Sequence, residues 1–260
     1  MTQLNDKNIT HTVNSYFDKV YVLNLERRKD RMSKIIAKMA FFGIEFERFN
    51  AVDGELLKSF SKQHINSPLL RSGAYIGCTL SHLSIIQDAK KNDYERILVL
   101  EDDVIIHKDF INLFDKLVKS LIETGCEWDI NYMGHLTYSE YFDNNDRDTL
   151  KVKKMYDLPF TKILSDRTST WGLHCIAYNN EPNNIYGKIL RDYEKDFTME
   201  YDRYILKSLA KDEAYRILIS YPQLMYQNFD NDNVSDLTGQ AGWLMEQCLH
   251  SGYSSIKDYI

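Results

Sequence analysis

The chain has 260 residues, 43% of them hydrophobic, which is enough for one large domain or two small ones with a sizeable core. A net charge of −6 argues against a general nucleic-acid binder, because such proteins usually present a basic face. The four cysteines include no CxxC pair, which argues against a zinc site and a disulfide framework and favours a reducing compartment.

The sequence predicts no membrane-spanning helix, because no run of about 18 apolar residues occurs. The first 15 residues also lack the apolar core of a secretory signal. We therefore expect a cytoplasmic protein, with peripheral membrane contact left open.

The first predicted elements follow a polar lead-in over residues 1–17. KVYVLNL (19–25) indicates a strand, and EFERFNAV (45–52) indicates a second. Between them, apolar residues recur at helical spacing from Met32 until Gly43, a typical helix stop. The order strand–helix–strand favours a parallel sheet with a crossover helix.

Residues 73–91 predict a long helix with apolar side chains on two nearly opposite sides, so we expect it to be sandwiched within the fold. RILVL (96–100) is an unbroken apolar run, which is typical of a strand covered on both faces. Further strands are expected at 128–134, 174–180 and within 216–227, further helices after 181, at 198–211 and near 241–248, and polar loops at 138–157 and 228–236. Together these elements predict a single α/β domain.

Three adjacent carboxylates, Glu101, Asp102 and Asp103, directly follow the RILVL strand. In open α/β sheets, ligands bind beyond the carboxyl ends of the strands. Adjacent carboxylates repel one another, and a hard cation such as Mn²⁺ or Mg²⁺ would offset that repulsion and hold the phosphate oxygens of a substrate. A solvated turn or a negatively charged helix N-terminus is the alternative, and these residues alone leave both open.

Two further candidates lie on predicted helices. Asp202 would share a helix face with the apolar Ile205, and burying an unpaired charge is costly, so a general base is one explanation. Pairing with the helix dipole or with Arg203 is the other, and Glu200 is a second candidate base. For His82, which follows Ser81, a hydrogen-bonded core histidine is favoured over direct chemistry.

Polar residues that follow the first strand suit a pocket for the nucleobase and the diphosphate of a nucleotide, because Arg can bind phosphate bidentately. Asn24 and Arg27 are the better candidates there, whereas Arg28 and Lys29 are expected on a solvated helix face; Arg31 follows on the same segment. Two more groups have ordinary packing or loop roles as alternatives: Trp171, Gly172 and His174 for a sugar pocket, and Gln227 and Asp236 for a loop that completes the metal shell.

Three segments carry a family resemblance: YVLNLERRKDRM (21–32), GCTLSHLSIIQDA (77–89) and ILVLEDDV (97–104). In this order and spacing, the sequence resembles glycosyltransferase family 25, most strongly over residues 18–110. That family includes bacterial lipooligosaccharide galactosyltransferases, which act in lipopolysaccharide biosynthesis, and enzymes of collagen glycosylation that galactosylate hydroxylysine.

The resemblance implies a GT-A-like single domain over residues 18–260, with a Rossmann-like, mainly parallel sheet and helices on both faces. It divides that domain into a nucleotide-binding half, 18–135, and an acceptor-binding half, 136–260. It also implies a nucleotide-sugar donor, most often UDP-galactose, and a divalent cation, usually Mn²⁺.

The resemblance also suggests roles for single residues. The acidic run stands where a GT-A fold carries its DxD motif, with Glu101 in place of the first Asp. Asp103 is then the first metal ligand, with Glu101 and Asp236 as further ligands, while Glu101 or Asp102 contacts the ribose. Donor binding falls to Asn24, Arg27, Ser81 and His82, and base catalysis to Asp202.

We therefore expect a metal-dependent, inverting transfer of galactose from UDP-galactose to a hydroxyl of a glycan or a protein. The alternatives are the same fold using UDP-glucose, or a nucleotide-sugar-binding module without turnover. A Mg²⁺-dependent phosphoesterase would share the acidic cluster but should lack the LSH and NLERRKDR motifs.

Overall fold

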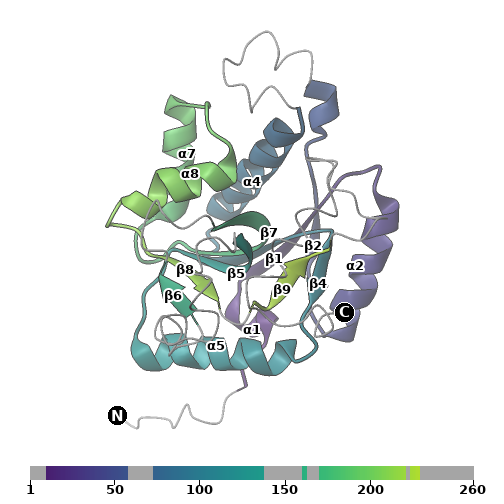
Figure 1. The fold of residues 1–260 in the computed structure, drawn as a ribbon, viewed down its shortest axis with the longest axis vertical. Helices are drawn as coiled ribbons and strands as arrows, with labels where there is room; N and C mark the ends of the chain where they lie inside the picture. Colours follow the sequence, from purple (N-terminus) through teal and green to yellow (C-terminus); the bar gives the residue numbers. More distant parts are fainter. Residues whose placement is uncertain (1–9, 58–72, 138–159, 163–169, 221–222, 229–260) are drawn as a thin grey trace, which may run out of the picture.

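The computed structural model describes residues 10–57, 73–137, 160–162, 170–220 and 223–228. Within them, a seven-stranded sheet has the strand order β2-β1-β3-β7-β5-β8-β6, and β4 and β9 form a second, two-stranded sheet (Figure 1). The strands are β1 (Lys19–Asn24), β2 (Glu47–Asn50), β3 (Arg96–Glu101), β4 (Val104–Ile106), β5 (Ile130–Thr137), β6 (Phe160–Lys162), β7 (Thr170–Asn179), β8 (Ile217–Ser220) and β9 (Met225–Gln227).

Helices lie on both faces of the large sheet. They are α1 (Val13–Tyr16), α2 (Lys29–Phe41), α4 (Gly73–Lys91), α5 (Phe110–Thr124), α7 (Ile185–Lys195) and α8 (Tyr201–Lys207), with 3-10 turns η2 (Gly54–Leu57) and η4 (Leu209–Lys211). Figure 1 shows α4, α7 and α8 above the sheet and α5 below it. In the described part of the chain, no helix combines the length and apolar character that crossing a membrane requires.

The sheet is mainly parallel, as expected. β1 pairs in parallel with both β2 and β3, and β5 pairs in parallel with β8. β7 is inserted antiparallel between β3 and β5, and β6 is antiparallel at the edge, so five of these seven strands share one direction. The predicted strand–helix–strand start of the chain is therefore confirmed as β1-α2-β2.

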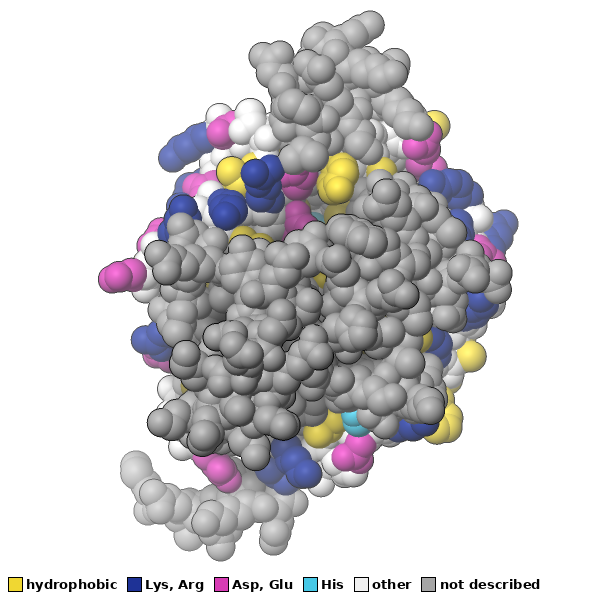
Figure 2. All heavy atoms as spheres, viewed as in Figure 1, with side chains coloured by type: hydrophobic (Ala, Val, Ile, Leu, Met, Phe, Trp, Pro, Cys, Tyr) yellow, Lys and Arg dark blue, Asp and Glu magenta, His cyan; other side chains and the backbone are white. Residues whose placement is uncertain are grey.

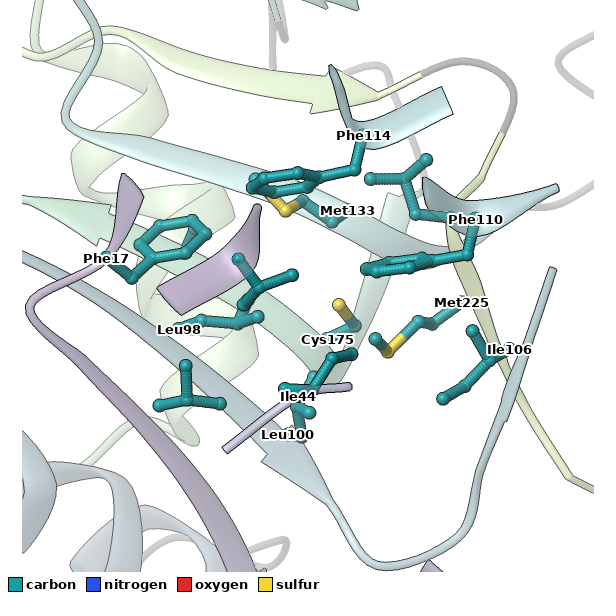
Figure 3. Close-up of a cluster of buried hydrophobic side chains, with 14 of the residues drawn as sticks. Phe17, Ile44, Leu98, Leu100, Ile106, Phe110, Phe114, Met133, Cys175 and Met225 are labelled. Carbon is teal, nitrogen blue, oxygen red and sulfur yellow. The ribbon is translucent and has the colours of Figure 1, made fainter. Parts of the chain in front are cut away.

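Strand β3 contributes to a hydrophobic core on each face of the sheet, because alternate side chains point to opposite faces. Leu98 and Leu100 pack into the α5-side core, shown in Figure 3 with Phe114 and Met133 around them. Ile97 and Val99 pack into the α4-side core. The unbroken apolar run therefore has the double coverage that the sequence predicts.

Helix α4 has the predicted bounds, and it is sandwiched as predicted. None of its residues from 73 to 86 is exposed, and it packs against α7, α8 and the η2 turn. Gly77 permits a close approach: a Cβ placed there would stand 2.5 Å from the Val52 carbonyl oxygen and 2.8 Å from the Gly54 amide nitrogen. The helix therefore seats directly on the segment that follows β2.

Replacing Gly77 with Ala is expected to lower the free energy of unfolding by about 1–3 kcal/mol, because the added methyl group overpacks against rigid backbone. At an unobstructed helix position the same change would raise stability by about 1 kcal/mol. The sign of the change in urea denaturation therefore tests the packing, and unchanged or increased stability would contradict it.

Two regions differ from the sequence expectations. Within the polar lead-in over 1–17, residues 13–16 form α1, and Val13, Tyr16 and Phe17 are buried in the α5-side core. The packed core therefore includes residues before position 18. Helix α5 is absent from the sequence prediction although it buries five side chains on one face. The expected loops at 138–157 and 228–236 and the helix near 241–248 lie outside the described residues.

Candidate functional site

A pocket lies at the carboxyl ends of β1 and β3, where the acidic run begins. Because β1 and β3 are parallel, with Leu23 paired to Glu101, their ends meet at one edge of the sheet. The segment after β2, the first half of α4 and the end of β9 complete the walls. The lining residues are Leu23, Leu25, Arg27, Arg31, Ala51, Val52, Asp53, Gly54, Glu55, Ala74, Cys78, Ser81, Glu101, Asp102, Asp103 and Gln227.

Protein donors on both oxygens hold the Asp102 carboxylate in place. Arg31 Nη1 donates to Asp102 Oδ1 at 3.1 Å, and Asn24 Nδ2 donates to Asp102 Oδ2 at 2.7 Å. Arg48 Nε in turn donates to Asn24 Oδ1 at 2.9 Å. Asn24 therefore contacts the acidic run by its hydrogen bond to Asp102. This bond fixes the position of the run relative to β1.

The two carboxylate oxygens of Asp103 differ in their hydrogen bonds. Its Oδ2 accepts hydrogen bonds from Arg31 Nη1 at 3.4 Å and Gln227 Nε2 at 3.3 Å. Its Oδ1 is buried and has no hydrogen-bond partner among the described residues. A buried, unsatisfied carboxylate oxygen is costly, and a cation bound at Oδ1 would offset that cost.

The pKa values of two carboxyl groups in the run are raised. Burial raises the pKa of Glu101 to about 7, aided by the charge of Asp102 and opposed by Arg31. Burial and the charge of Glu101 likewise raise the pKa of Asp103 to about 7. These carboxyl groups are therefore only partly ionised at neutral pH, and a cation could take the place of their protons.

Arg31 offsets the charge of this cluster from inside the fold. Its side chain is 8% exposed and contacts both Asp102 and Asp103. Replacing Arg31 with Met should lower the free energy of unfolding at pH 8 by about 3 kcal/mol, because removing one partner of a buried ion pair leaves uncompensated charge. The loss should be smaller at pH 5, where Asp103 and Glu101 are protonated.

Arg28 is the matched control, because the side chain of its partner Asp30 is 57% exposed, whereas those of the Arg31 partners Asp102 and Asp103 are 9% and 5% exposed. Arg28→Met should change stability by no more than about 1 kcal/mol, as is usual for surface pairs. Equal losses for the Arg31 and Arg28 variants in urea denaturation would refute the structural role of Arg31. The Arg28 side chain is only 18% exposed, so it is less solvated than the helix face predicted for it.

Ser81 and Arg27 line different parts of the pocket wall. Ser81 Oγ donates to the Gly77 carbonyl oxygen at 2.6 Å and accepts from the Val52 amide at 2.8 Å. Ser81 thus ties α4 to the segment after β2. Arg27 is exposed, and its Nε lies 3.5 Å from Asp53 Oδ2, so its guanidinium group stands at the solvent side of the pocket.

His82 lies behind Glu101, with 1% of its surface exposed. Its Nε2 is 3.8 Å from Glu101 Oε1, and its ring stacks on Tyr201 with 5.2 Å between centroids. Burial lowers the pKa of His82 to about 3, opposed by the charge of Asp202. The imidazole is therefore neutral at physiological pH, and in the described part of the chain neither of its nitrogens has a hydrogen-bond partner.

Asp202 lies in the first turn of α8, on the side of the site occupied by His82 and Glu101. It is half-buried, and its Oδ1 accepts the Arg203 backbone amide at 2.7 Å. Burial raises its pKa, and its charge acts on both His82 and Glu101. Glu200, the second candidate base, is buried, with Oε1 unpartnered and Oε2 4.0 Å from Arg203 Nη1.

The structure brings most of the predicted residues together. Arg27, Ser81, Glu101, Asp102 and Asp103 line one pocket, and Asn24 and His82 contact members of it. Asp236 and the side chain of Trp171 lie outside the described residues. His174, expected near a sugar pocket, is fully buried on β7 and does not line this pocket.

The central role of Arg31 goes beyond the sequence prediction. Arg27 lies in the turn before α2, whereas Arg31 lies in the first turn of the helix. The hydrogen bond from Gln227 to Asp103 joins residues 124 positions apart in the sequence, so no local sequence pattern predicts it. Figure 2 shows both basic and acidic side chains among the described residues around the edge of one face.

Comparisons with known proteins identify relatives of this chain. The family described as glycosyltransferase family 25 (LPS biosynthesis protein) matches residues 17–191. Procollagen galactosyltransferase 2 of Mus musculus is 30% identical over 131 residues, which are 45% of this chain and 21% of that protein. The human protein named inactive glycosyltransferase 25 family member 3 is 32% identical over 129 residues, covering 45% and 22%.

The chain thus spans about a fifth of the length of these relatives. Among solved structures, a glycosyltransferase involved in the glycosylation of the major capsid of PBCV-1 aligns with 80% of this chain and 91% of its own, at 11% identity and a TM-score of 0.41. The family match covers all three sequence motifs and the whole acidic run. This chain belongs to glycosyltransferase family 25.

Proposed function

We propose that this chain is a cation-dependent glycosyltransferase that moves galactose from UDP-galactose to a hydroxyl group with inversion at the anomeric carbon. Family membership supports glycosyl transfer. The unpartnered, buried Oδ1 of Asp103, at the carboxyl edge of the sheet, is the observation that carries the cation dependence. Mn²⁺ is the expected ion and Mg²⁺ the alternative.

Asp103 and Glu101 would hold the cation, with Asp236 as a further ligand from outside the described residues. A bound cation would stabilise the negative charge that develops on the departing nucleoside diphosphate. Arg31 and Asn24 keep the acidic run in position for that task. Arg27, exposed on the solvent side, is suited to pair with a phosphate oxygen.

The proton of the acceptor hydroxyl goes to Asp202. Burial raises the pKa of this carboxylate, which makes it a stronger base than an exposed aspartate. In an inverting reaction the base and the leaving group act on opposite faces of the sugar. We therefore expect the sugar to lie between Asp202 and the cation held by Asp103.

The described pocket encloses only the innermost part of such a site. Its volume is about 130 Å³, whereas sites for small organic ligands usually enclose roughly 300–1,000 Å³. A nucleotide sugar would therefore extend beyond the described walls, with its diphosphate at the acidic run.

The choice of galactose rests on the relatives. Procollagen galactosyltransferase 2 acts on collagen by its name, and the family description refers to lipopolysaccharide biosynthesis, so glycan and protein hydroxyl groups are the two acceptor classes. Screening UDP-galactose, UDP-glucose, UDP-N-acetylglucosamine and GDP-mannose for Mn²⁺-dependent hydrolysis tests the donor. Preference for UDP-glucose would overturn the sugar alone, and preference for GDP-mannose would overturn the uridine donor.

A nucleotide-sugar-binding module without turnover is the second candidate. The 32% identity to a human relative named inactive glycosyltransferase 25 family member 3 favours this alternative. The intact acidic run and the half-buried Asp202 favour turnover. UDP binding with Mn²⁺, but no hydrolysis or transfer with any donor of the panel, would decide for the module.

Cation binding should depend steeply on pH. Protons compete with the cation for Glu101 and Asp103, whose pKa values are about 7. Mn²⁺ affinity should therefore fall by about 10- to 100-fold per pH unit below pH 6, for one or two displaced protons, and level off above pH 8. Calorimetry between pH 5.5 and 8.5 measures this, and a pH-independent affinity would exclude both carboxyl groups as ligands.

The same two carboxyl groups should make the metal-free protein less stable as the pH rises, whereas cation binding becomes tighter. Their raised pKa values mean that the folded state holds their protons more tightly than the unfolded state. This contribution to stability is complete below about pH 4 and is lost as the pH rises through about 7. In a chelating buffer, Asp103→Asn should therefore reduce the loss of stability between pH 5 and pH 8, as measured by urea denaturation.

A further inference from the structure

A second group of metal-ligating atoms lies beside the acidic run, on its α4 side. Cys78 and His82 stand one helical turn apart on α4, and Glu101 ends β3. One ligand atom from each of the three residues lies within 4.8 Å of the other two. The helix thus presents a sulfur and a nitrogen to the same carboxylate.

The His82 imidazole lacks a partner for either nitrogen, although the residue is only 1% exposed. Glu101 Oε1 lies 3.8 Å from Nε2, which is too far for a hydrogen bond. Stacking on Tyr201 occupies the ring face and leaves both nitrogens unsatisfied. Burying such a group without a partner is costly, so a ligand at the imidazole nitrogen would offset this cost.

We propose that Cys78, His82 and Glu101 bind a transition-metal cation of the Zn²⁺ class, at a second site that shares Glu101 with the hard-cation site on Asp103. Thiolate and imidazole ligands select Zn²⁺ or Co²⁺ over Mg²⁺ and Mn²⁺. Binding replaces the thiol proton of Cys78, which leaves to solvent, and involves no oxidation or reduction.

The geometry suits three protein ligands and one open position. Metal–ligand bonds of about 2.0–2.3 Å place tetrahedral ligands roughly 3.3–3.8 Å apart, and the separation of His82 Nε2 from Glu101 Oε1 is already 3.8 Å. Cys78 and Glu101 also line the pocket, so an ion could enter from it and keep a fourth position facing it. Three protein ligands with an open fourth position are typical of reactive rather than structural zinc sites.

The sequence argued against zinc because it contains no CxxC pair. A Cys and a His four residues apart on a helix achieve the same convergence, because positions i and i+4 share one face. The third ligand comes from the end of a strand that packs beside that helix. Only the fold therefore brings these residues together.

Co²⁺ alone is the probe, because a thiolate ligand gives bound Co²⁺ a sulfur-to-metal charge-transfer band in the near ultraviolet. The wild-type protein should show this band, and Zn²⁺ should displace it. Cys78→Ser should abolish it, and His82→Gln should weaken Co²⁺ binding at least tenfold. Circular dichroism checks that each variant is folded, and Ser is close in size to Cys.

Two control variants locate the band. Cys126→Ser should leave the band unchanged, because Cys126 is not one of the proposed ligands. It follows the end of α5, and its sulfur lies 3.6 Å from the carbonyl oxygen of Glu127. Asp103→Asn should also retain the band while losing Mn²⁺ binding, which separates the two cation sites. Absence of the band in the wild type at saturating Co²⁺, or its persistence in folded Cys78→Ser, would overturn the proposal. Neither outcome depends on a donor or on glycosyl transfer.

Discussion

Asp103→Ala is expected to abolish the Mn²⁺ dependence of UDP binding and to lower galactose transfer by at least about 10²–10³-fold. The magnitude is typical of removing one electrostatic contact to a developing negative charge. The prediction rests on the buried Oδ1 of Asp103, which lacks a protein donor while its Oδ2 is held by Arg31 and Gln227. Calorimetry of UDP with and without Mn²⁺, together with a transfer assay, measures both effects.

Loss of fold would not explain such a result. The raised pKa of Asp103 shows that its charge opposes folding, so removing the carboxylate should not destabilise the metal-free protein at pH 8. Asp30→Ala, a change at an exposed aspartate on α2, serves as the matched control and should leave UDP binding unchanged. If Asp103→Ala binds UDP as tightly as the wild type in the presence of Mn²⁺, Asp103 is not a ligand of the donor cation.

The parts of the fold that the sequence predicts are those with strong local periodicity. The run 97–100 is apolar on both faces of β3, and it is buried on both faces. The two-sided apolar pattern of 73–91 gives α4 its bounds and its sandwiched position. In both cases a local pattern is enough, because burial on two sides requires apolar residues at nearly every position.

Helix α5 is missing from the sequence prediction although its apolar residues follow a clear helical pattern. Phe110, Phe114, Leu117 and Leu121 recur at helical spacing, and Gly125 ends the helix in the left-handed conformation, with a φ of 58°. The antiparallel insertion of β7 is different, because the residues of β7 read as a strand but give no sign of their partners. Strand order depends on which faces pack together, and β7 pairs with β3 across about 80 residues of sequence.

The candidate site divides in the same way. The acidic run can be recognised in the sequence because three adjacent carboxylates repel one another and a cation would offset that repulsion. The fold does place them at the end of a buried strand. The contacts that distinguish them do not follow from sequence. Asp102 is held by Asn24 and Arg31 from β1 and α2, whereas Asp103 keeps one oxygen unpartnered. These contacts depend on how β1, α2 and β3 pack, and they assign neighbouring aspartates to different tasks.

Asp202 is the residue whose role depends most on position. Its carboxylate is half-buried at the start of α8, and its charge acts on His82 and Glu101. The bond from the Arg203 amide to Oδ1 orients the carboxylate. The raised pKa brings it closer to the working pH, where a general base is most effective.

Asp202→Asn should therefore lower galactose transfer by about 10²–10⁴-fold, the usual contribution of general-base catalysis, and leave Mn²⁺-dependent UDP binding nearly intact. The amide keeps the size of the carboxylate and can still accept the Arg203 amide bond, but it cannot take the acceptor's proton. Glu200→Gln is the matched comparison, because Glu200 is the nearby second candidate and is buried with an unpartnered oxygen. A large loss in Glu200→Gln with near-normal transfer in Asp202→Asn would move the base to Glu200. Equal loss of UDP binding and transfer in Asp202→Asn would instead make Asp202 a part of the donor site, because a base for the acceptor acts only after the donor is bound.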